Sequence, residues 1–312
     1  MNLPPGYIAE PARMDDLDEY VALFEAWDLA DCGRIDPVRE SLAADLSSSA
    51  SDLQRDTAVV RDPGRHVAAM TQVSAIDPAS SIDLFARVHP AHQGRGLGAA
   101  ALAWMEDRAV ERIPGGAVPA LYNATSDTDR AGVALLAAHG YRHARTFQHL
   151  EGDLSGAAPP RDPDGISIRG FRPGLDDRAF YDTLEDAFRG HFDWQTQPYE
   201  DWRHDVLEGA GFDPSLCFLA SDGDDTAGVV HGMVTGDEGY VQDVGVRRGH
   251  RGRGVGEALL RTVFSAFAAR GLARVALNVD AGNETGATRL YERVGMRPRR
   301  TWLVHEKHLP AG

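Results

Sequence analysis

Residues 251–256 form a glycine-rich turn whose composition and position could bind phosphate. The turn reads Arg251-Gly252-Arg253-Gly254-Val255-Gly256; it follows an apolar strand pattern at residues 244–246 and opens an amphipathic helical pattern. Glycines let a backbone approach a ligand closely, and the free N–H groups and dipole of a helix start attract phosphate oxygens. Arg251 and Arg253 could add charge-assisted hydrogen bonds. No Gly-Lys-Ser/Thr follows, so this is not a P-loop, and many glycine-rich turns are only tight turns.

A second motif follows at residues 283–295, where Asn283, Ala287, Tyr291 and Gly295 recur at every fourth position. The turn and this motif together resemble the GCN5-related N-acetyltransferase (GNAT) superfamily, which uses acetyl-coenzyme A (acetyl-CoA) as co-substrate. The resemblance implies that the fourth and fifth strands of the fold splay apart and that the pantetheine arm of the co-substrate lies in the gap.

The same resemblance assigns expected roles to residues of the second half of the chain. Backbone groups of Val244 and Val246 are expected to bind the pantetheine arm. Asn283 is expected to contact this arm, and Tyr291 to lie near the thioester sulfur. The pyrophosphate is expected on the backbone amides of Arg251, Gly252, Arg253, Gly254, Val255 and Gly256.

Acetyl transfer from a thioester to an amine requires a neutral amine, an oxyanion donor and an acid. Alkyl amines have a pKa near 10.4, so a base or a desolvating site must remove a proton. Asp243 is the candidate base, although it could equally be a structural hydrogen-bond acceptor; strand alternation places it opposite Val244 and Val246. The resemblance implies the Val246 amide as oxyanion donor. Tyr291 is the predicted acid for the thiolate, with a packed core aromatic as the alternative.

The chain contains an internal repeat, which is typical of two fused copies of one domain. Residues 88–98 match residues 246–256 with identical spacing, and both carry Gly-Arg-Gly-x-Gly. Residues 135–141 then match 290–296, and Arg145-Thr146-Phe147 matches Arg300-Thr301-Trp302. A Pro/Gly/Asp-rich stretch separates the copies and reads as a linker. We therefore expect an N-terminal GNAT domain at 1–154, a linker at 155–165 and a catalytic C-terminal GNAT domain at 166–312.

Strand and helix patterns alternate through the second copy and predict an α/β fold, with a mixed sheet covered by helices on both faces. The predicted strands are 166–170, 217–221, 228–235, 240–246, 275–279 and 300–307. The predicted helices are 176–189, 199–208, 254–269 and 285–294.

The first copy differs from the second at the expected chemical positions. Phe85 replaces Asp243, Leu136 replaces Tyr291 and Thr128 replaces Asn283 when the copies are aligned on their glycines. We expect a non-catalytic domain that shapes or covers the active cleft. Its glycine turn is intact, so a second coenzyme A site remains possible at Val88, Gln93, Gly94, Arg95, Gly96 and Gly98. A wholly non-catalytic acyl-CoA sensor is the alternative function, and Tyr291 and Asn283 argue against it.

Tandem GNAT proteins of this length resemble the mycothiol synthase group, to which the segments 187–191 and 211–214 are similar. Tyr240 stands where that group is expected to carry an acidic residue. The predicted acceptor is the primary amine of a small molecule that is amino-sugar, aminoglycoside-like or mycothiol-precursor-like. Aromatic residues of the first helices in the second copy could contact it, although a helix–helix core is the alternative for each of them. These residues are His191, Trp194, Tyr199 and Trp202.

Composition limits the partners and the compartment. The formal net charge of −15 disfavours nucleic acid and tolerates a cationic substrate, although it could serve solubility alone. Two isolated cysteines, Cys32 and Cys217, indicate a reducing, cytoplasmic location. No secretory signal and no long apolar run is found, so no membrane association is expected. His305 and His308 face opposite sides of a predicted strand, so no metal site is expected. We expect a monomer or a homodimer.

Overall fold

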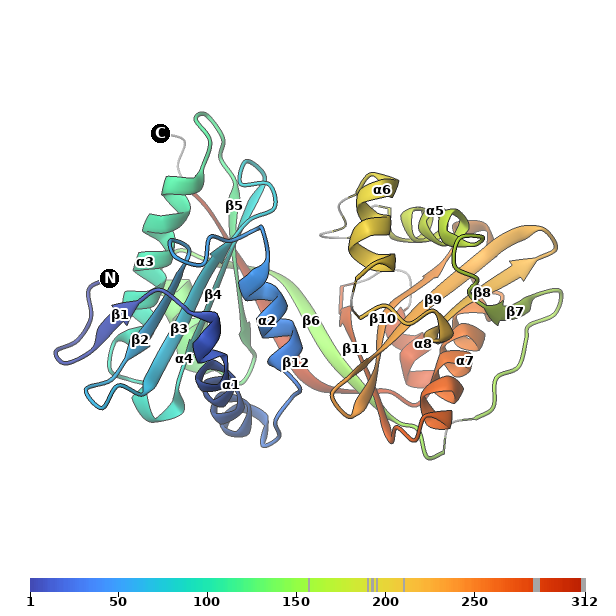
Figure 1. The fold of residues 1–312 in the computed structure, drawn as a ribbon, viewed down its shortest axis with the longest axis horizontal. Coiled ribbons are helices and arrows are strands. Elements are labelled where there is room, and N and C mark those ends of the chain that lie inside the picture. The colour runs from blue at the N-terminus through green and yellow to red at the C-terminus, as the bar shows by residue number, and fades with distance from the viewer. Residues whose placement is uncertain are drawn as a thin grey trace. The chain divides into compact units, whose positions relative to one another are not determined.

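A computed structural model describes residues 1–156, 158–189, 191, 194, 196–209, 211–282 and 287–309. The chain forms two compact units (Figure 1). The first unit comprises Met1–Phe147 and Arg300–Gly312, and the second comprises Gln148–Arg299.

The first unit is a mixed sheet in the strand order β1-β2-β3-β4-β5-β12. Neighbouring strands are antiparallel except for β4 and β5, which are parallel. Its strands are β1 (Ile8–Glu10), β2 (Thr57–Arg61), β3 (Val67–Ser74), β4 (Ser81–Val88), β5 (Ala120–Ser126) and the end of β12 (Arg297–His308). Its helices are α1 (Leu17–Cys32), α2 (Arg39–Ser47), α3 (Leu97–Arg112) and α4 (Arg130–Ala138), with short 3-10 turns η1 (Met14–Asp16) and η2 (Pro90–His92).

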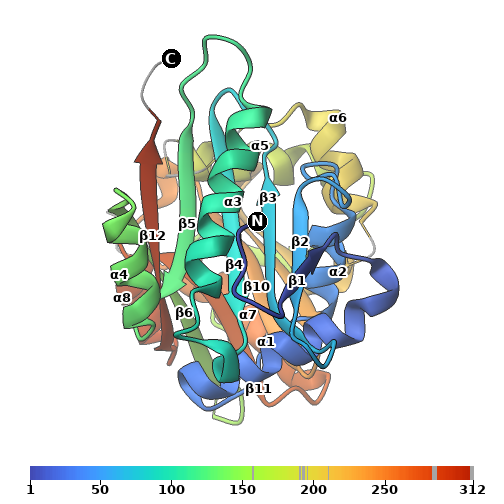
Figure 2. The same ribbon diagram turned by 90° about the vertical axis from the view of Figure 1, so that its left-hand side faces the viewer.

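Helices cover both faces of this first sheet. Tyr20 and Leu23 of α1 and Leu42 of α2 pack with Val59 and Met70 of the sheet. On the other face α3 lies over β3 and β4 (Figure 2). Strand side chains alternate between the two faces, so β2 and β3, which are covered on both faces, are buried at nearly every position.

The second unit repeats this arrangement in the strand order β6-β11-β10-β9-β8-β7. Strands β10 and β11 are parallel, and β7–β10 form an antiparallel meander. The strands are β6 (Arg142–Asp153), β7 (Ser167–Gly170), β8 (Cys217–Asp222), β9 (Asp225–Thr235), β10 (Glu238–Val246) and β11 (Arg274–Asp280). The helices are α5 (Asp177–Phe188), α6 (Tyr199–Trp202), the π-helix η3 (Arg203–Leu207), α7 (Val255–Ala269) and α8 (Ala287–Arg293), with 3-10 turns η4 (Pro214–Leu216) and η5 (Arg248–His250).

Two hydrophobic clusters sandwich the second sheet. On one face, α7 contributes Leu259, Val263 and Phe267, which pack with Val230 and Val241 of the strands. On the other face lies an aromatic cluster, which consists of Phe180 and Tyr181 of α5, Trp202 of α6, Phe171 after β7 and their neighbours. The predicted fold class, a mixed α/β sheet in two tandem domains, is confirmed, and every helix and strand predicted in the second copy is present within a few residues.

Strands β6 and β12 each pass from one unit to the other. Residues 302–308 of β12, which belong to the second copy by sequence, pair with β5 in the first unit. Residues 148–153 of β6 belong to the second unit, where Leu150 lies in the core and the Leu154 N–H donates to the Ala273 carbonyl at 2.9 Å. The expected domains at 1–154 and 166–312 follow the sequence repeat, whereas the compact units follow these strands. The described residues of the expected linker 155–165 lie between β6 and β7.

Candidate active site

The strands β10 and β11 separate soon after they meet, which creates an open edge on β10. Their parallel pairing, in the described chain, is limited to Gly239 with Val275 and Tyr240 with Ala276. At the far end of β10 the Arg247 N–H donates to the Ala227 carbonyl on β9 at 3.0 Å. Because antiparallel bonding alternates along a strand, the N–H and carbonyl of Val246 point away from β9, toward the open edge.

A β-bulge at Gln242 determines which residues of β10 stand opposite which residues of β9. Val241 pairs with Gly232 of β9, and Asp243 pairs with His231, so Gln242 has no opposing residue. The extra residue turns Asp243 toward the α5 side of the sheet, while Val244 and Val246 pack toward α7. Bulges often re-aim a side chain at a functional site in this way.

His231 is a buried side chain that faces Asp243 and that sequence reasoning did not identify. It is 6% exposed, and its Nδ1 lies 3.6 Å from Asp243 Oδ2. Neither ring nitrogen has a hydrogen-bond partner among the described residues. Buried imidazole nitrogens normally have partners, so His231 is a candidate functional residue. The available signal was a lone histidine in the apolar run Val229-Val230-His231-Gly232.

Two tyrosines lie within electrostatic range of Asp243. Burial, followed by the charge of Asp243, raises the pKa of Tyr240 to about 12, although a hydrogen bond with the Asn278 backbone opposes the shift. Burial and the charges of Asp243 and Tyr240 raise the pKa of Tyr291 well above its usual value. Both phenols therefore stay protonated at neutral pH and can donate hydrogen bonds or a proton. Tyr291 is 7% exposed and comes from α8.

The glycine turn joins β10 to α7 at the end of the open edge. Gly252 and Gly254 have φ of 77° and 82°, in the left-handed region that glycine adopts without strain. Gly254 is the N-cap of α7. No backbone hydrogen bond occupies the amides of residues 252–256 in the described structure, so these N–H groups are available to an anion at the helix start.

The two arginines of the turn are bound to protein groups. Arg251 donates to the carbonyls of Val246 at 3.2 Å and Ala187 at 2.9 Å. Arg253 pairs with Asp222 at 2.6 Å. A guanidinium carries several donors in a planar fork, so unused N–H groups remain on both side chains. Their contacts with a phosphate stay a prediction.

The first unit repeats the backbone geometry of the turn. Gly94 and Gly96 have φ of 71° and 85°, and Gly96 is the N-cap of α3. The His89 N–H donates to the Ala68 carbonyl at 2.9 Å, as the Arg247 N–H does to Ala227. The backbone of Val88 therefore also faces an open edge, because β4 and β5 stop pairing at Leu84 and Asn123.

The remaining residues of the possible second coenzyme A site have protein contacts. The Arg95 guanidinium donates to the Tyr7 hydroxyl at 3.1 Å. Gln93 donates its N–H to the Pro90 carbonyl at 3.3 Å. Gly98 lies where an added Cβ would meet Leu135 at 3.4 Å.

Apolar side chains in the first unit replace the polar groups of the second. Phe85 stands opposite Gln72 in the register that Asp243 and His231 occupy, and its ring stacks on Phe24. Leu136, at the place of Tyr291, is buried in the core. Thr128 hydrogen-bonds to Asp31 and to Ser126. No side chain at these positions can act as an acid or base in transfer.

The four predicted substrate contacts occupy different surroundings. Trp202 lies in the aromatic core, 6% exposed and stacked near Phe180, and Tyr199 is half-buried beside it. Trp194 stacks on Phe188 with ring centroids 4.7 Å apart. His191 lies nearer the turn: burial and the charge of Arg251 lower its pKa. Asn283, the predicted contact of the co-substrate arm, lies outside the described residues.

Of the other residues singled out from composition, Cys217 lies on β8 directly opposite His231 of β9, whereas His305 belongs to the first unit. Burial raises the pKa of the Cys217 thiol to about 12, and that of His305 is lowered by burial. Within the described ranges, no group of three His, Cys, Asp or Glu side chains could hold a metal ion. None of the described helices is both long enough and apolar enough to span a bilayer.

Comparison with known families and relatives places this geometry among acetyltransferases. The model of the acetyltransferase (GNAT) family matches residues 24–141 and 178–296. A mycothiol acetyltransferase of Thermobispora bispora is 33% identical over 219 residues, which cover 67% of this chain and 70% of the relative. A mycothiol acetyltransferase of Streptomyces scabiei is 32% identical over 250 residues, which cover 78% and 77% of the two chains.

Solved structures share the whole two-unit fold. A GCN5-related N-acetyltransferase from Sphaerobacter thermophilus is 31% identical, has a TM-score of 0.86, and aligns over 98% of this chain and 97% of its own. A tandem GNAT protein from the clavulanic acid biosynthesis pathway, solved without AcCoA, is 18% identical, with a TM-score of 0.76 over 98% and 100% of the two chains. At that identity the likeness concerns the fold alone.

Proposed function

The chain belongs to the acetyltransferase (GNAT) family and is an N-acetyltransferase, and we propose that its second unit transfers an acetyl group from acetyl-CoA to the primary amine of a small molecule. The acceptor is amino-sugar, aminoglycoside-like or mycothiol-precursor-like. One observation carries the assignment to the second unit: Asp243, His231, Tyr240 and Tyr291 converge beside the open edge of β10, whereas the first unit has Phe85 and Leu136 instead.

The fit of acetyl-CoA rests on the backbone. The amides of residues 252–256 and the α7 dipole would hold the pyrophosphate, and the outward-facing groups of Val244 and Val246 would hold the arm. The co-substrate supplies the activated acetyl group as a thioester. Acetyl-CoA is an anion, whereas the chain as a whole is acidic. The arginines of the turn provide local positive charge for this ligand; they are Arg247, Arg248, Arg251 and Arg253.

The chain's own groups would then manage the protons. The Asp243–His231 pair would take a proton from the acceptor ammonium, and the resulting imidazolium would be stabilised by a carboxylate 3.6 Å away. The Val246 N–H would donate to the developing oxyanion from the open edge of β10. Tyr291, which is protonated at neutral pH, would give its proton to the departing thiolate, and the second proton that the acceptor nitrogen loses as the amide forms would restore the phenol.

The test is thiol release from acetyl-CoA with glucosamine, an aminoglycoside and a cysteinyl sugar amide as acceptors. Tyr291→Phe should lower kcat by about 100-fold or more, since general acid catalysis typically contributes that much. Calorimetric titration should give the same acetyl-CoA affinity for this variant. Tyr141→Phe is the matched control, because it deletes the hydroxyl of another buried tyrosine, in the first unit. Equal turnover in both variants would refute the role of Tyr291, and absence of acetyl-CoA binding would refute the function.

A further inference from the structure

The first unit contains a cavity of about 340 Å³ beside strands β3 and β4. It is lined by helical and strand residues that include Phe24, Leu42, Asp45, Gln72, Asp83 and Phe85. Its volume lies in the range of small-molecule sites, roughly 300–1,000 Å³. All its lining residues belong to the first unit.

The cavity occupies the register at which the second unit has its candidate acid–base groups. Gln72 pairs with Phe85 as His231 pairs with Asp243. Two residues further along the meander, Ser74 pairs with Asp83 where Met233 pairs with Tyr240. In each unit the register is counted back from that unit's own glycine turn. The first unit therefore has a recess at the register where the second unit has Asp243 and His231.

Asp45 gives the cavity a charge that the protein does not neutralise. In the described part of the chain no basic or hydrogen-bonding group lies against its carboxylate. The residue as a whole is exposed, yet the atoms packed around its carboxyl group raise its pKa through burial. A carboxylate in such surroundings is stabilised by a cation that enters the cavity. Asp83 adds a second carboxylate to the wall.

Part of the cavity wall is aromatic. The rings of Phe24 and Phe85 stack with centroids 5.5 Å apart and an interplanar angle of 14°. An apolar ring or chain can pack on these phenyl groups, and an ammonium gains from the face of an aromatic ring. Arg87 contacts the Phe85 ring at 4.5 Å but does not line the cavity.

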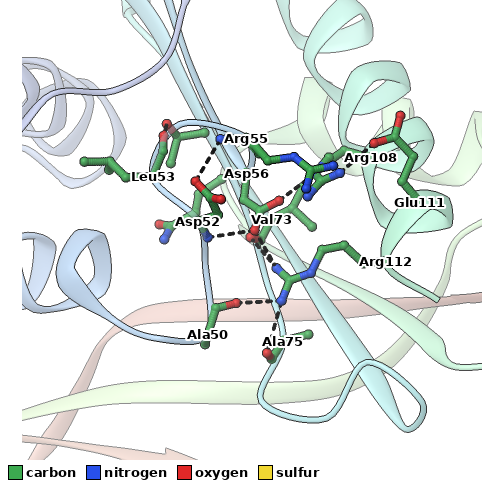
Figure 3. Close-up of polar contacts among 12 residues, drawn as sticks. Ala50, Asp52, Leu53, Arg55, Asp56, Val73, Ala75, Arg108, Glu111 and Arg112 are labelled. Carbon is green, nitrogen blue, oxygen red and sulfur yellow. Dashed lines mark hydrogen bonds and ion pairs between the residues drawn. The ribbon is translucent and has the colours of Figure 1, made fainter. Parts of the chain in front are cut away.

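A buried ion-pair network holds the cavity wall in place (Figure 3). Asp56 binds Arg108 at 2.6 Å and Arg112 at 3.1 Å. Arg112 also donates to the carbonyls of Ala50 at 2.9 Å and Ala75 at 3.3 Å, and both alanines line the cavity. A recess whose wall is fixed by such a network is preformed, which lowers the cost of binding.

We propose that this cavity is a binding site for a small organic ammonium ion that carries an apolar ring or chain. Asp45 would hold the charged head, and Phe24 and Phe85 would cover the apolar part. Because carboxylates stabilise the protonated amine, which is not a nucleophile, the ligand would be bound rather than acetylated. The inference does not depend on which unit performs the transfer.

The test is calorimetric titration of the full chain with 2-phenylethylamine and with 3-phenylpropionate, two probes of similar shape and opposite charge. The cation should bind and the anion should bind at least about tenfold more weakly. Asp45→Asn should weaken binding of the cation by about tenfold, the loss expected for one charge-assisted contact. Ser41→Trp, which places a large ring on a lining position of α2, should also weaken it.

Matched variants separate this site from the rest of the protein. Asp107→Asn removes an exposed carboxylate of α3, and Ser47→Trp adds a ring on α2 outside the lining; both should bind the cation as the parent does. The proposal is overturned if the cation does not bind up to about 10 mM, or if binding survives both Asp45→Asn and Ser41→Trp. It is also overturned if Asp243→Asn abolishes the same binding, because the probe would then occupy the second unit.

Discussion

Asp243 is the residue on which the electrostatics of the candidate site depend. Its charge raises the pKa values of Tyr240 and Tyr291 in addition to the effect of burial, and it faces His231 across the sheet. The carboxylate lies beside two phenols that stay protonated at neutral pH and beside the imidazole of His231, which is an arrangement suited to proton transfer. Strongly shifted tyrosine pKa values beside a carboxylate are typical of functional sites.

We predict that His231 and Asp243 act as one unit in catalysis. His231→Gln and Asp243→Asn should each lower kcat/KM by about 10- to 100-fold, because each removes half of the same proton acceptor. The double variant should be little worse than either single one, since two groups that work together are not additive. Steady-state kinetics of the four proteins at several pH values, with circular dichroism to check folding, measures this. Additive losses would show that the two residues act independently.

A second prediction concerns the pH dependence of stability at Asp176. Burial opposes ionisation of this carboxyl group, but hydrogen bonds from Arg172 and Arg169 outweigh burial and lower its pKa far below the ordinary value. A lowered pKa in the folded state stabilises the fold above the unfolded pKa near 4, and this contribution is lost as pH falls further. Asp176→Asn should therefore cost about 2 kcal/mol of unfolding free energy at pH 7.

Urea unfolding from pH 7 to pH 3 measures this difference. The gap between the parent and Asp176→Asn should narrow as pH falls below about 4. Asp182→Asn is the control, because Asp182 pairs with Arg178 on the exposed surface of α5 and should cost little at any pH. A gap that stays constant down to pH 3 would contradict the charge argument.

At the scale of elements, the two glycine turns are the most closely repeated feature of the chain. Each connects a strand whose last residues face an open edge to a helix whose N-cap is a left-handed glycine. Because backbone angles and hydrogen bonds repeat, we expect that each turn can bind a pyrophosphate. The two units differ in the side chains beside the edge, and we expect this difference to affect chemistry rather than binding.

We therefore predict two acetyl-CoA sites per chain. Gly254→Ala and Gly96→Ala each force a Cβ into the left-handed region, at about 1–2 kcal/mol, and displace the amides at a helix start. Calorimetry should give two sites for the parent and one for each variant, and only Gly254→Ala should lose turnover. Gly115→Ala is the control, because its φ is not positive and its Cβ would meet open space. A single site in the parent, lost in Gly254→Ala, would assign the first turn a structural role.

At the scale of the whole molecule, β6 and β12 each pass from one compact unit to the other. Neither sequence copy can therefore complete its own sheet. The first unit takes Arg300 and Trp302 from the end of the chain. Arg300 is 6% exposed and binds Asp28 at 2.8 Å and Asp36 at 3.0 Å, while Trp302 stacks on Trp27. These contacts join residues at opposite ends of the sequence within one core.

We predict that a chain ending at Arg299 loses the stability of its first unit. Removal of β12 leaves β5 with an unpaired edge, and it leaves Asp28 and Asp36 buried or half-buried without their shared arginine. Hydrogen exchange should rise throughout β4 and β5 and remain low in α7 and β9. A chain ending at Leu309 is the control and should behave as the full chain. If the amides of β5 are as well protected in the shorter chain as in the full chain, β12 does not stabilise the first unit.

Local features of the sequence were sufficient for the class of fold, the repeat and the glycine turn. Left-handed glycines, helix starts and the period of buried residues act over a few positions, so they can be read from neighbouring residues alone. The same holds for the replacement of Asp243 by Phe85, which follows from aligning the two turns. The residues 283–286 lie outside the described structure, so the role of Asn283 remains a prediction.

Only the tertiary structure decided which residues meet across strands. His231 faces Asp243 because a bulge at Gln242 shifts the register by one residue, and the pattern of β10 alone does not say which residue of β9 stands opposite Asp243. The exchange of β6 and β12 was equally hidden, since a strand with the right alternation can complete either of two similar sheets. The cavity depends on α1, α2 and two strands together. Pairing between distant segments is set by packing of the whole fold, which no local pattern encodes.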